Sequence, residues 1–211
     1  KPTALPPETV RRQFFASSEG KRAVVFIDGS NWYHKLRLLL STSLPLQRPP
    51  IDFDIRHFAQ NLVKPNIPVE VRYYIGKVRR VKGNIKSETL YGNQQRLLRF
   101  LQHQSIVLRF GHLIPYPDKS FHEKGVDVLL AVEMIKFAIE DKYDVAYLVS
   151  SDTDLVPAVE ECKTLRKEIV YVGSALHGQS LGLTMSCNRT ILLRPADVLP
   201  FVPQPRSPTA M

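Results

Sequence analysis

The chain has 211 residues, 44% apolar and 23% charged, which is typical of a globular domain and excludes a disordered chain. Its 29 Lys and Arg residues against 20 Asp and Glu residues give a formal net charge of +9, which favours a polyanionic partner, either nucleic acid or an acidic membrane surface. No apolar run approaches the roughly 20 residues that cross a bilayer, and Cys162 and Cys187 have neither metal-ligand nor disulfide-framework spacing. We therefore expect a protein of the reducing cytoplasm without a membrane partner.

Apolar runs and helical periodicity alternate along the chain. The expected strands cover residues 23–27, 69–75, 105–110, 144–149 and 168–172. The expected helices cover residues 31–40, 54–63, 88–103, 126–141 and 155–166, with a weaker candidate at 175–186. This alternation predicts the α/β class: a three-layer α/β/α sandwich with a mostly parallel central sheet of about five strands.

The two ends of the chain differ from its middle. Residues 1–20 carry Pro and charge without sustained periodicity, and residues 195–211 contain five prolines. We therefore expect an N-terminal arm over 1–20, one domain over 21–194 and an extended, Pro-rich tail over 195–211.

Aspartates stand where two of the expected strands end. Asp28 follows one strand in the segment FIDGSN, and Asp152 and Asp154 follow another in SSDTDL. The carboxyl ends of parallel strands open into the crevice where α/β sheets bind ligands. Carboxylates gathered there repel one another unless a cation joins them, and with the neighbouring hydroxyls they suit Mg²⁺ or Mn²⁺. Helix capping is the alternative, which explains one aspartate more easily than two.

A third acidic residue, Asp127, opens the long apolar helix in the segment KGVDV. The helix dipole favours a carboxylate in the first turn whatever the function, so this position alone is weak support for a site. Because the helix feeds the strand at 144–149, however, its start is expected at the same sheet edge as Asp28. Lys124, one turn earlier, could contact a phosphate or position a nucleophilic water.

Together, the FIDGSN, KGVDV and VSSDTDL segments resemble the NYN domain, the LabA-like branch of the PIN-like nuclease superfamily, over roughly residues 21–173. The resemblance implies a PIN-like sandwich and a metal-dependent ribonuclease. Asn31 matches the family's polar residue after the first strand and is expected to order the site, and Ser151 is a second candidate for that role. The acids that match the family's Mg²⁺ or Mn²⁺ ligands are Asp28, Asp127, Asp152 and Asp154.

Basic residues follow the expected strand at 69–75, so they begin at the same sheet edge as the aspartates. Such a loop can hold a phosphate backbone in a sequence-independent and salt-sensitive way, although an ordinary solvated loop is the alternative. Nearby aromatic side chains, among them Tyr73, Tyr74, Tyr91 and either Trp32 or Tyr33, could stack on unpaired bases. The basic residues are Lys77, Arg79, Arg80, Lys82 and Lys86.

The leading hypothesis is therefore a metal-dependent ribonuclease acting on single-stranded or loop RNA, for which one or two ions would activate water at a phosphodiester. A homo-oligomer is compatible with the sequence. The alternative is a catalytically weak or inactive RNA-binding module of the same fold. A glycosyltransferase that used Asp152-Thr153-Asp154 would leave Asp28 and Asp127 without a role. The near P-loop at 173–180 has Gln179 where that motif requires Lys.

Overall fold

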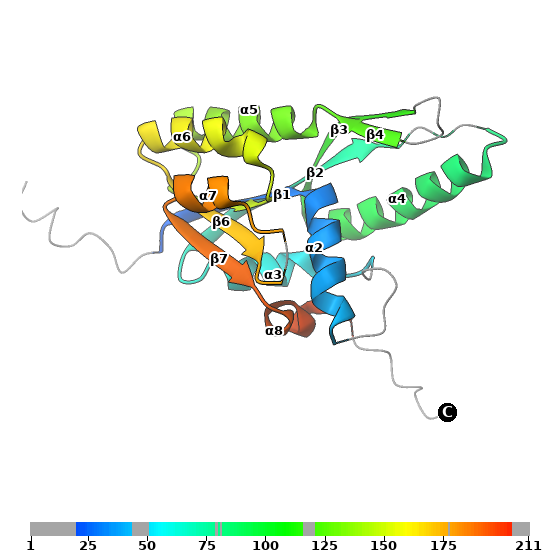
Figure 1. The fold of residues 1–211 in the computed structure, drawn as a ribbon, viewed down its shortest axis with the longest axis horizontal. Helices are drawn as coiled ribbons and strands as arrows, with labels where there is room; N and C mark the ends of the chain where they lie inside the picture. The colour runs from blue at the N-terminus through cyan, green and yellow to red at the C-terminus, as the bar shows by residue number, and fades with distance from the viewer. Residues whose placement is uncertain are drawn as a thin grey trace, which may run out of the picture.

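The computed structural model describes residues 20–43, 51–78, 80, 82–115, 121–176 and 178–203. At its centre is a seven-stranded sheet in the order β4-β3-β2-β1-β5-β6-β7 (Figure 1). Six strands run parallel, and β4 pairs antiparallel with β3. The strands are β1 (Arg22–Asp28), β2 (Ile67–Lys77), β3 (Val107–Pro115), β4 (Phe121–Lys124), β5 (Val145–Val149), β6 (Glu168–Ser174) and β7 (Arg189–Leu193).

Helices cover both faces of the sheet, so the predicted α/β/α sandwich is confirmed. One face carries α2 (Gly29–Ser41), α3 (Ile55–Leu62), α4 (Ile85–His103) and α8 (Pro195–Val198). The other carries α5 (Val126–Ile139), α6 (Val156–Thr164) and α7 (Leu181–Ser186), with the short helix η1 (Thr153–Leu155) before α6. None of the helices in these described ranges combines the length and the hydrophobicity that crossing a bilayer requires.

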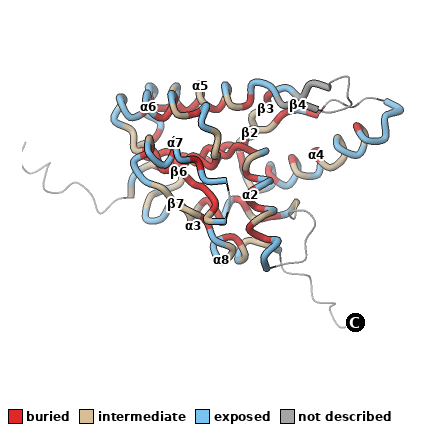
Figure 2. The backbone as a smooth tube through the Cα atoms, viewed as in Figure 1, coloured by how far each residue is buried: buried red, intermediate tan, exposed pale blue. Residues whose placement is uncertain are grey.

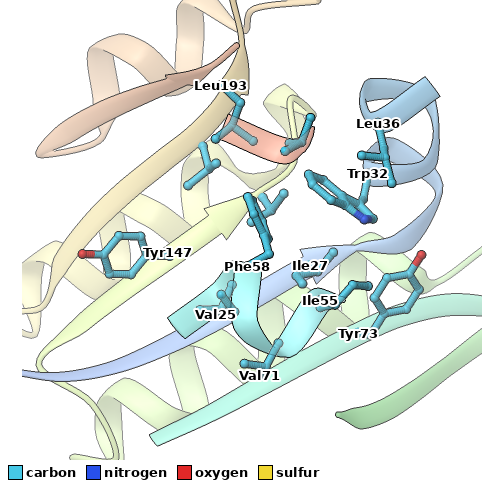
Figure 3. Close-up of a cluster of buried hydrophobic side chains, with 14 of the residues drawn as sticks. Val25, Ile27, Trp32, Leu36, Ile55, Phe58, Val71, Tyr73, Tyr147 and Leu193 are labelled. Atoms are coloured by element: carbon cyan, nitrogen blue, oxygen red, sulfur yellow. The ribbon is translucent and has the colours of Figure 1, made fainter. Parts of the chain in front are cut away.

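The central strands are buried on both sides (Figure 2). Along β1, Val25 and Ile27 pack beneath α2 and α3, whereas Phe26 packs beneath α5. A strand covered on both faces reads as an uninterrupted apolar run, which is why the sequence located it. Figure 3 shows the hydrophobic core beneath α2 and α3, where the rings of Trp32 and Phe58 stack with centroids 5.0 Å apart.

Two strands and one helix were not expected from the sequence. The β4 sequence, FHEK, has no apolar run and pairs only with the neighbouring β3, while β7 is a half-exposed edge strand. The extended tail predicted from Pro195 onward is wrong for its first part, because Pro195 opens α8 and the helical turn η2 (Leu199–Phe201) follows. Proline suits the first turn of a helix, and Val198 is fully buried. Residues 1–19 and 204–211 lie outside the described residues.

A buried ion network joins α5 to the sheet. Arg72 on β2 donates to Glu133 of α5 at 2.7 Å, the Tyr74 hydroxyl donates to the same carboxylate at 2.8 Å, and Arg109 of β3 pairs with it. Burial acts to raise the pKa of Glu133, but the hydrogen bonds from these three residues hold it below its usual range. The network fixes α5 against β2 and β3, and it thereby fixes the position of Asp127 in the first turn of the helix.

We expect Glu133→Ala to lower the free energy of unfolding by about 3 kcal/mol or more, because it leaves the buried Arg72 guanidinium without this carboxylate. Urea unfolding followed by circular dichroism measures the loss. Glu140→Ala is the matched control on the same chain segment, since Glu140 forms its ion pairs at the surface, and its unfolding midpoint should stay unchanged. Equal midpoints for the two variants would contradict a structural role for the network.

Candidate active site

Asp28 is the last residue of β1, and only 5% of its surface is exposed. Its Oδ1 accepts the Asn31 backbone N–H at 3.0 Å, so it caps α2, and its Oδ2 accepts the Ser150 hydroxyl at 2.9 Å. A Cβ on the next residue, Gly29, would lie 2.4 Å from the Tyr73 ring, so glycine alone lets α2 begin this close to β2. Capping therefore explains one of the two Asp28 oxygens and leaves its burial unexplained.

The Ser150 hydroxyl connects the ends of β1 and β5. It donates to Asp28 and accepts the Asp152 backbone N–H at 3.1 Å, and Ser150 is fully buried. Asp152 in turn caps η1, because its Oδ1 accepts the Asp154 N–H at 2.9 Å. Asp154 lies exposed in the first turn of η1. Asp152 is therefore linked to Asp28 through Ser150, and it also caps η1.

Ser151 orders this loop through a residue that the sequence analysis missed. Its hydroxyl lies 2.7 Å from the hydroxyl of Tyr171, a fully buried residue of β6, and makes no hydrogen bond to an aspartate within the described part of the chain. The same Tyr171 hydroxyl accepts the Ser180 backbone N–H at 3.0 Å. A tyrosine inside a buried strand needs a partner for its hydroxyl, which is the sequence signal that could have indicated this contact.

Asp127 lies in the first turn of α5, behind Gly125, whose φ of 76° starts the helix without a side-chain cap. Burial raises the pKa of Asp127, and the negative charges of Asp28, Asp152 and Asp154 raise it further. The pKa of Asp28 is likewise raised, first by burial and in part by Asp152. Asp127 thus lies within electrostatic reach of the other three predicted acids, which come from two other segments.

Lys35 is a second residue that the sequence analysis missed. It lies one turn after Asn31 in α2, is only 5% exposed, and donates its Nζ proton to the Asn31 side-chain oxygen. Burial lowers the pKa of Lys35 to about 8, against the opposing attraction of Asp28. The i, i+4 spacing from Asn31, on the helix that Asp28 caps, is the sequence signal for this contact.

Two of the predicted basic residues end strands at the carboxyl side of the sheet. Lys77 is the last residue of β2, and its Nζ lies 5.9 Å from the centre of the Phe110 ring. Lys124 is the last residue of β4 and is exposed directly before Gly125. Both cations therefore border the edge that carries the aspartates.

The remaining basic residues continue away from this edge toward α4. Arg80 pairs with Glu88 at 3.3 Å, whereas Lys82 and Lys86 are exposed, Lys86 in the first turn of α4. Arg79 lies outside the described residues. The basic segment is thus a surface feature that runs from the end of β2 to the start of α4.

The aromatic candidates divide sharply by burial. Trp32, Tyr73 and Tyr74 are at most 3% exposed and pack in the cores, so they are not available to stack on bases. Tyr33, in contrast, is 38% exposed on α2, and Tyr91 is half-buried on α4. Of the neighbouring pair Trp32 and Tyr33, the tryptophan is the core residue.

Comparison with known proteins identifies the family of the chain. The model of the NYN domain matches residues 22–194. The chain belongs to the NYN domain family. This family is part of the PIN-like nuclease superfamily. A crystal structure of a Vibrio parahaemolyticus protein of unknown function shares the fold, with a TM-score of 0.60 and 17% identity over 87% of this chain and 99% of that one. A search of curated proteins found no match.

PIN-like nucleases generally use divalent metals, and the donor set of this NYN domain has the chemistry to hold one. Carboxylates and hydroxyls are the oxygen ligands that Mg²⁺ and Mn²⁺ prefer. The raised pKa values of Asp28 and Asp127 record a repulsion that a cation would offset. In the described parts of the chain, however, no group of three or more acidic, His or Cys side chains lies close enough to hold an ion as it stands.

We expect Asp127→Asn to raise the melting temperature at neutral pH in EDTA by about 1–3 °C. The rise is small because Asp127 is partly exposed and solvent screens its charge. A carboxyl group whose pKa is raised by folding binds its proton more tightly in the folded state. Its ionisation therefore destabilises the protein as the pH rises above the group's ordinary pKa. A role limited to the helix dipole predicts the opposite sign, a lower melting temperature. Differential scanning fluorimetry distinguishes the two outcomes.

Proposed function

We propose that this NYN domain is a divalent-metal-dependent ribonuclease that hydrolyses RNA phosphodiester bonds at the carboxyl edge of the sheet, in the cytoplasm, with Mg²⁺ or Mn²⁺. One observation carries the proposal: Asp127 has three acidic neighbours from two other segments, the buried Asp28 and the pair Asp152 and Asp154. Structural capping requires no such concentration of like charge. A Mg²⁺ or Mn²⁺ centre explains it, since these ions prefer carboxylate oxygens as protein ligands.

In this proposal Asp28, Asp127, Asp152 and Asp154 hold the metal. When bound, the metal supplies an activated water and stabilises charge on the phosphoryl oxygens. The protein contributes fixed geometry, because the Ser150 hydroxyl joins the carboxylate of Asp28 to the backbone of Asp152.

Two cations serve different purposes in this site. Lys35 is buried, so it balances the charge of Asp28 and holds the Asn31 side chain instead of meeting the substrate. Lys124 is exposed beside the start of α5 and is free to contact a phosphate of the RNA. The substrate assignment to RNA, single-stranded or in loops, follows from the basic residues that border the acids and from the formal net charge of +9.

We expect Asp28→Asn to reduce Mn²⁺-dependent cleavage of a labelled single-stranded RNA by about 100-fold or more, because it removes the buried ligand charge. Asparagine still caps α2, so the variant should remain folded. Asp141→Asn is the matched control: Asp141 is exposed and pairs with Arg22 and Lys167 near the opposite, amino edge of the sheet. Identical products from wild type and Asp28→Asn, quantified on denaturing gels, would overturn the proposed function.

The basic segment is tested by the salt dependence of RNA binding. We expect Lys82→Ala to weaken binding of all single-stranded sequences alike, and to reduce the slope of log K against log salt by about 0.7 for one lost phosphate contact. Fluorescence anisotropy in EDTA at several salt concentrations measures both effects. Lys136→Ala, an exposed lysine of α5 that pairs with Glu140, should leave the slope unchanged. A slope unaltered by Lys82→Ala would remove the segment from the RNA interface.

A catalytically weak or inactive RNA-binding module is the alternative function, and the spacing of the acids in the described residues favours it, since no three of them converge on one point. The same assays separate the two functions. Such a module would show the Lys82 effect on binding, but Mn²⁺ would produce no cleavage that Asp28→Asn abolishes.

A further inference from the structure

A groove lies between α2 and α4 on the face of the sheet that is opposite α5. Its main part is a cavity of about 640 Å³, a size typical of small-molecule sites. A second hollow of about 220 Å³ shares part of the same wall and reaches Gly29 and Ser30, directly after Asp28. The α2–α4 groove therefore reaches the residues that directly follow Asp28, although none of the four aspartates lines it. The wall residues common to both hollows are Tyr33, Tyr73, Ile75, Gln94 and Leu97.

A polar contact ties α4 to the end of β2 along the wall of the groove. The Gln94 side chain donates to the Gly76 carbonyl at 2.7 Å and accepts the Val78 N–H at 2.9 Å, all in buried surroundings. The start of α4 stands away from the sheet, and Ile85 is 82% exposed (Figure 1). The groove is open to solvent between these two helices and is large enough to admit a ligand.

The lining combines apolar walls with a few polar groups at the rim. Tyr33 on α2 and Leu90 on α4 both line the cavity and are 38% and 37% exposed, so they border its mouth. Asn93 and Arg37 also line the cavity, and within the described chain neither side chain has a hydrogen-bond or ion-pair partner. Apolar walls can contact the face of a nucleobase, and the amide of Asn93 and the guanidinium of Arg37 can hydrogen-bond to its edges.

The charge along the groove favours a strand with a phosphate backbone. Beyond the main cavity lies a further hollow of about 320 Å³ whose lining includes Arg96 and Arg99, with Asp52 as its acidic member. At the other end, Lys77 borders the carboxyl edge. Among the described residues Lys77, Arg37 and Arg96 form no ion pair, so their charges are available to phosphates.

We propose that the α2–α4 groove binds an unpaired base of the single-stranded nucleic acid whose backbone crosses the aspartates. This inference rests on the proposed function, which places the strand across the aspartates. It adds a site for a base, which holds the strand in place. A duplex keeps its bases stacked and cannot insert one into the groove without paying for unstacking, so the groove selects unpaired nucleotides. Stacking against Tyr33 is tolerant of sequence, because every base presents a π-face.

The test compares two fluorescent probes in EDTA: a single-stranded oligoribonucleotide, and an abasic ribose-phosphate oligomer of the same length and charge. The wild-type protein is expected to bind the base-bearing probe more tightly. Tyr33→Ala, which removes the stacking ring, and Leu90→Trp, which fills the mouth, should each weaken that binding about ten-fold, while the abasic probe discriminates little between variants. Val132→Ala, an exposed apolar residue of α5 on the opposite face, is the control and should change neither affinity.

Equal affinity of the wild type for both probes would overturn the inference, as would base-bearing affinities unaffected by both groove variants. Hydrolysis of bis(p-nitrophenyl) phosphate with Mn²⁺, a diester without a nucleobase, separates this result from the proposed function. If Asp28→Asn abolishes this hydrolysis but the wild type binds both probes alike, the inference about the groove is overturned and the proposed function stands. A preference for bases that the groove variants remove, without such hydrolysis, supports the groove and overturns the nuclease activity.

Discussion

The desolvation of the Asp28 carboxylate is the constraint on which the rest of the site depends. Placing a charge at the end of a strand buried on both faces is unfavourable unless neighbours compensate for it. Three neighbours do so from two directions: the Asn31 N–H and the Lys35 ammonium from α2, and the Ser150 hydroxyl from β5. Each contact also fixes the element that supplies it. The strand ends are therefore held in register by the same interactions that make a buried carboxylate tolerable.

Helix α5 shows the difference between a structural and a functional acid within one element. Glu133 is surrounded by Arg72, Tyr74 and Arg109, and its pKa is lowered despite burial. Asp127, two turns earlier, has acidic neighbours in place of cations, and its pKa is raised. The first carboxylate stabilises the fold, whereas the second destabilises it unless a cation is supplied. Uncompensated charge that a fold maintains at some cost in stability is typical of a functional site.

Much of the fold and of the acidic cluster could be predicted from the sequence, because doubly buried strands and long helices leave strong apolar patterns. The antiparallel β4 and the edge strand β7 could not, since a short or half-exposed strand is stabilised by its neighbours and not by its own pattern. The sequence did not indicate the role of Tyr171 for a related reason. That role depends on a hydroxyl contact with Ser151, which lies 20 positions earlier in the chain. The α2–α4 groove depends on the packing of two helices, which no local pattern encodes.

The carboxyl edge of the sheet carries aspartates and its surroundings carry lysines and arginines, and a single function explains both charges. Four aspartates repel a phosphate as well as one another, so a bound cation would favour substrate and a bound substrate would favour the cation. The exposed basic residues raise the local concentration of a polyanion without specifying its position. A base held at a fixed place sets the distance between its nucleotide and the aspartates, and salt screens that contact little. An apolar groove that opens next to Gly29 provides such a place, because a base held there would bring a nearby phosphate of the same strand to Asp28.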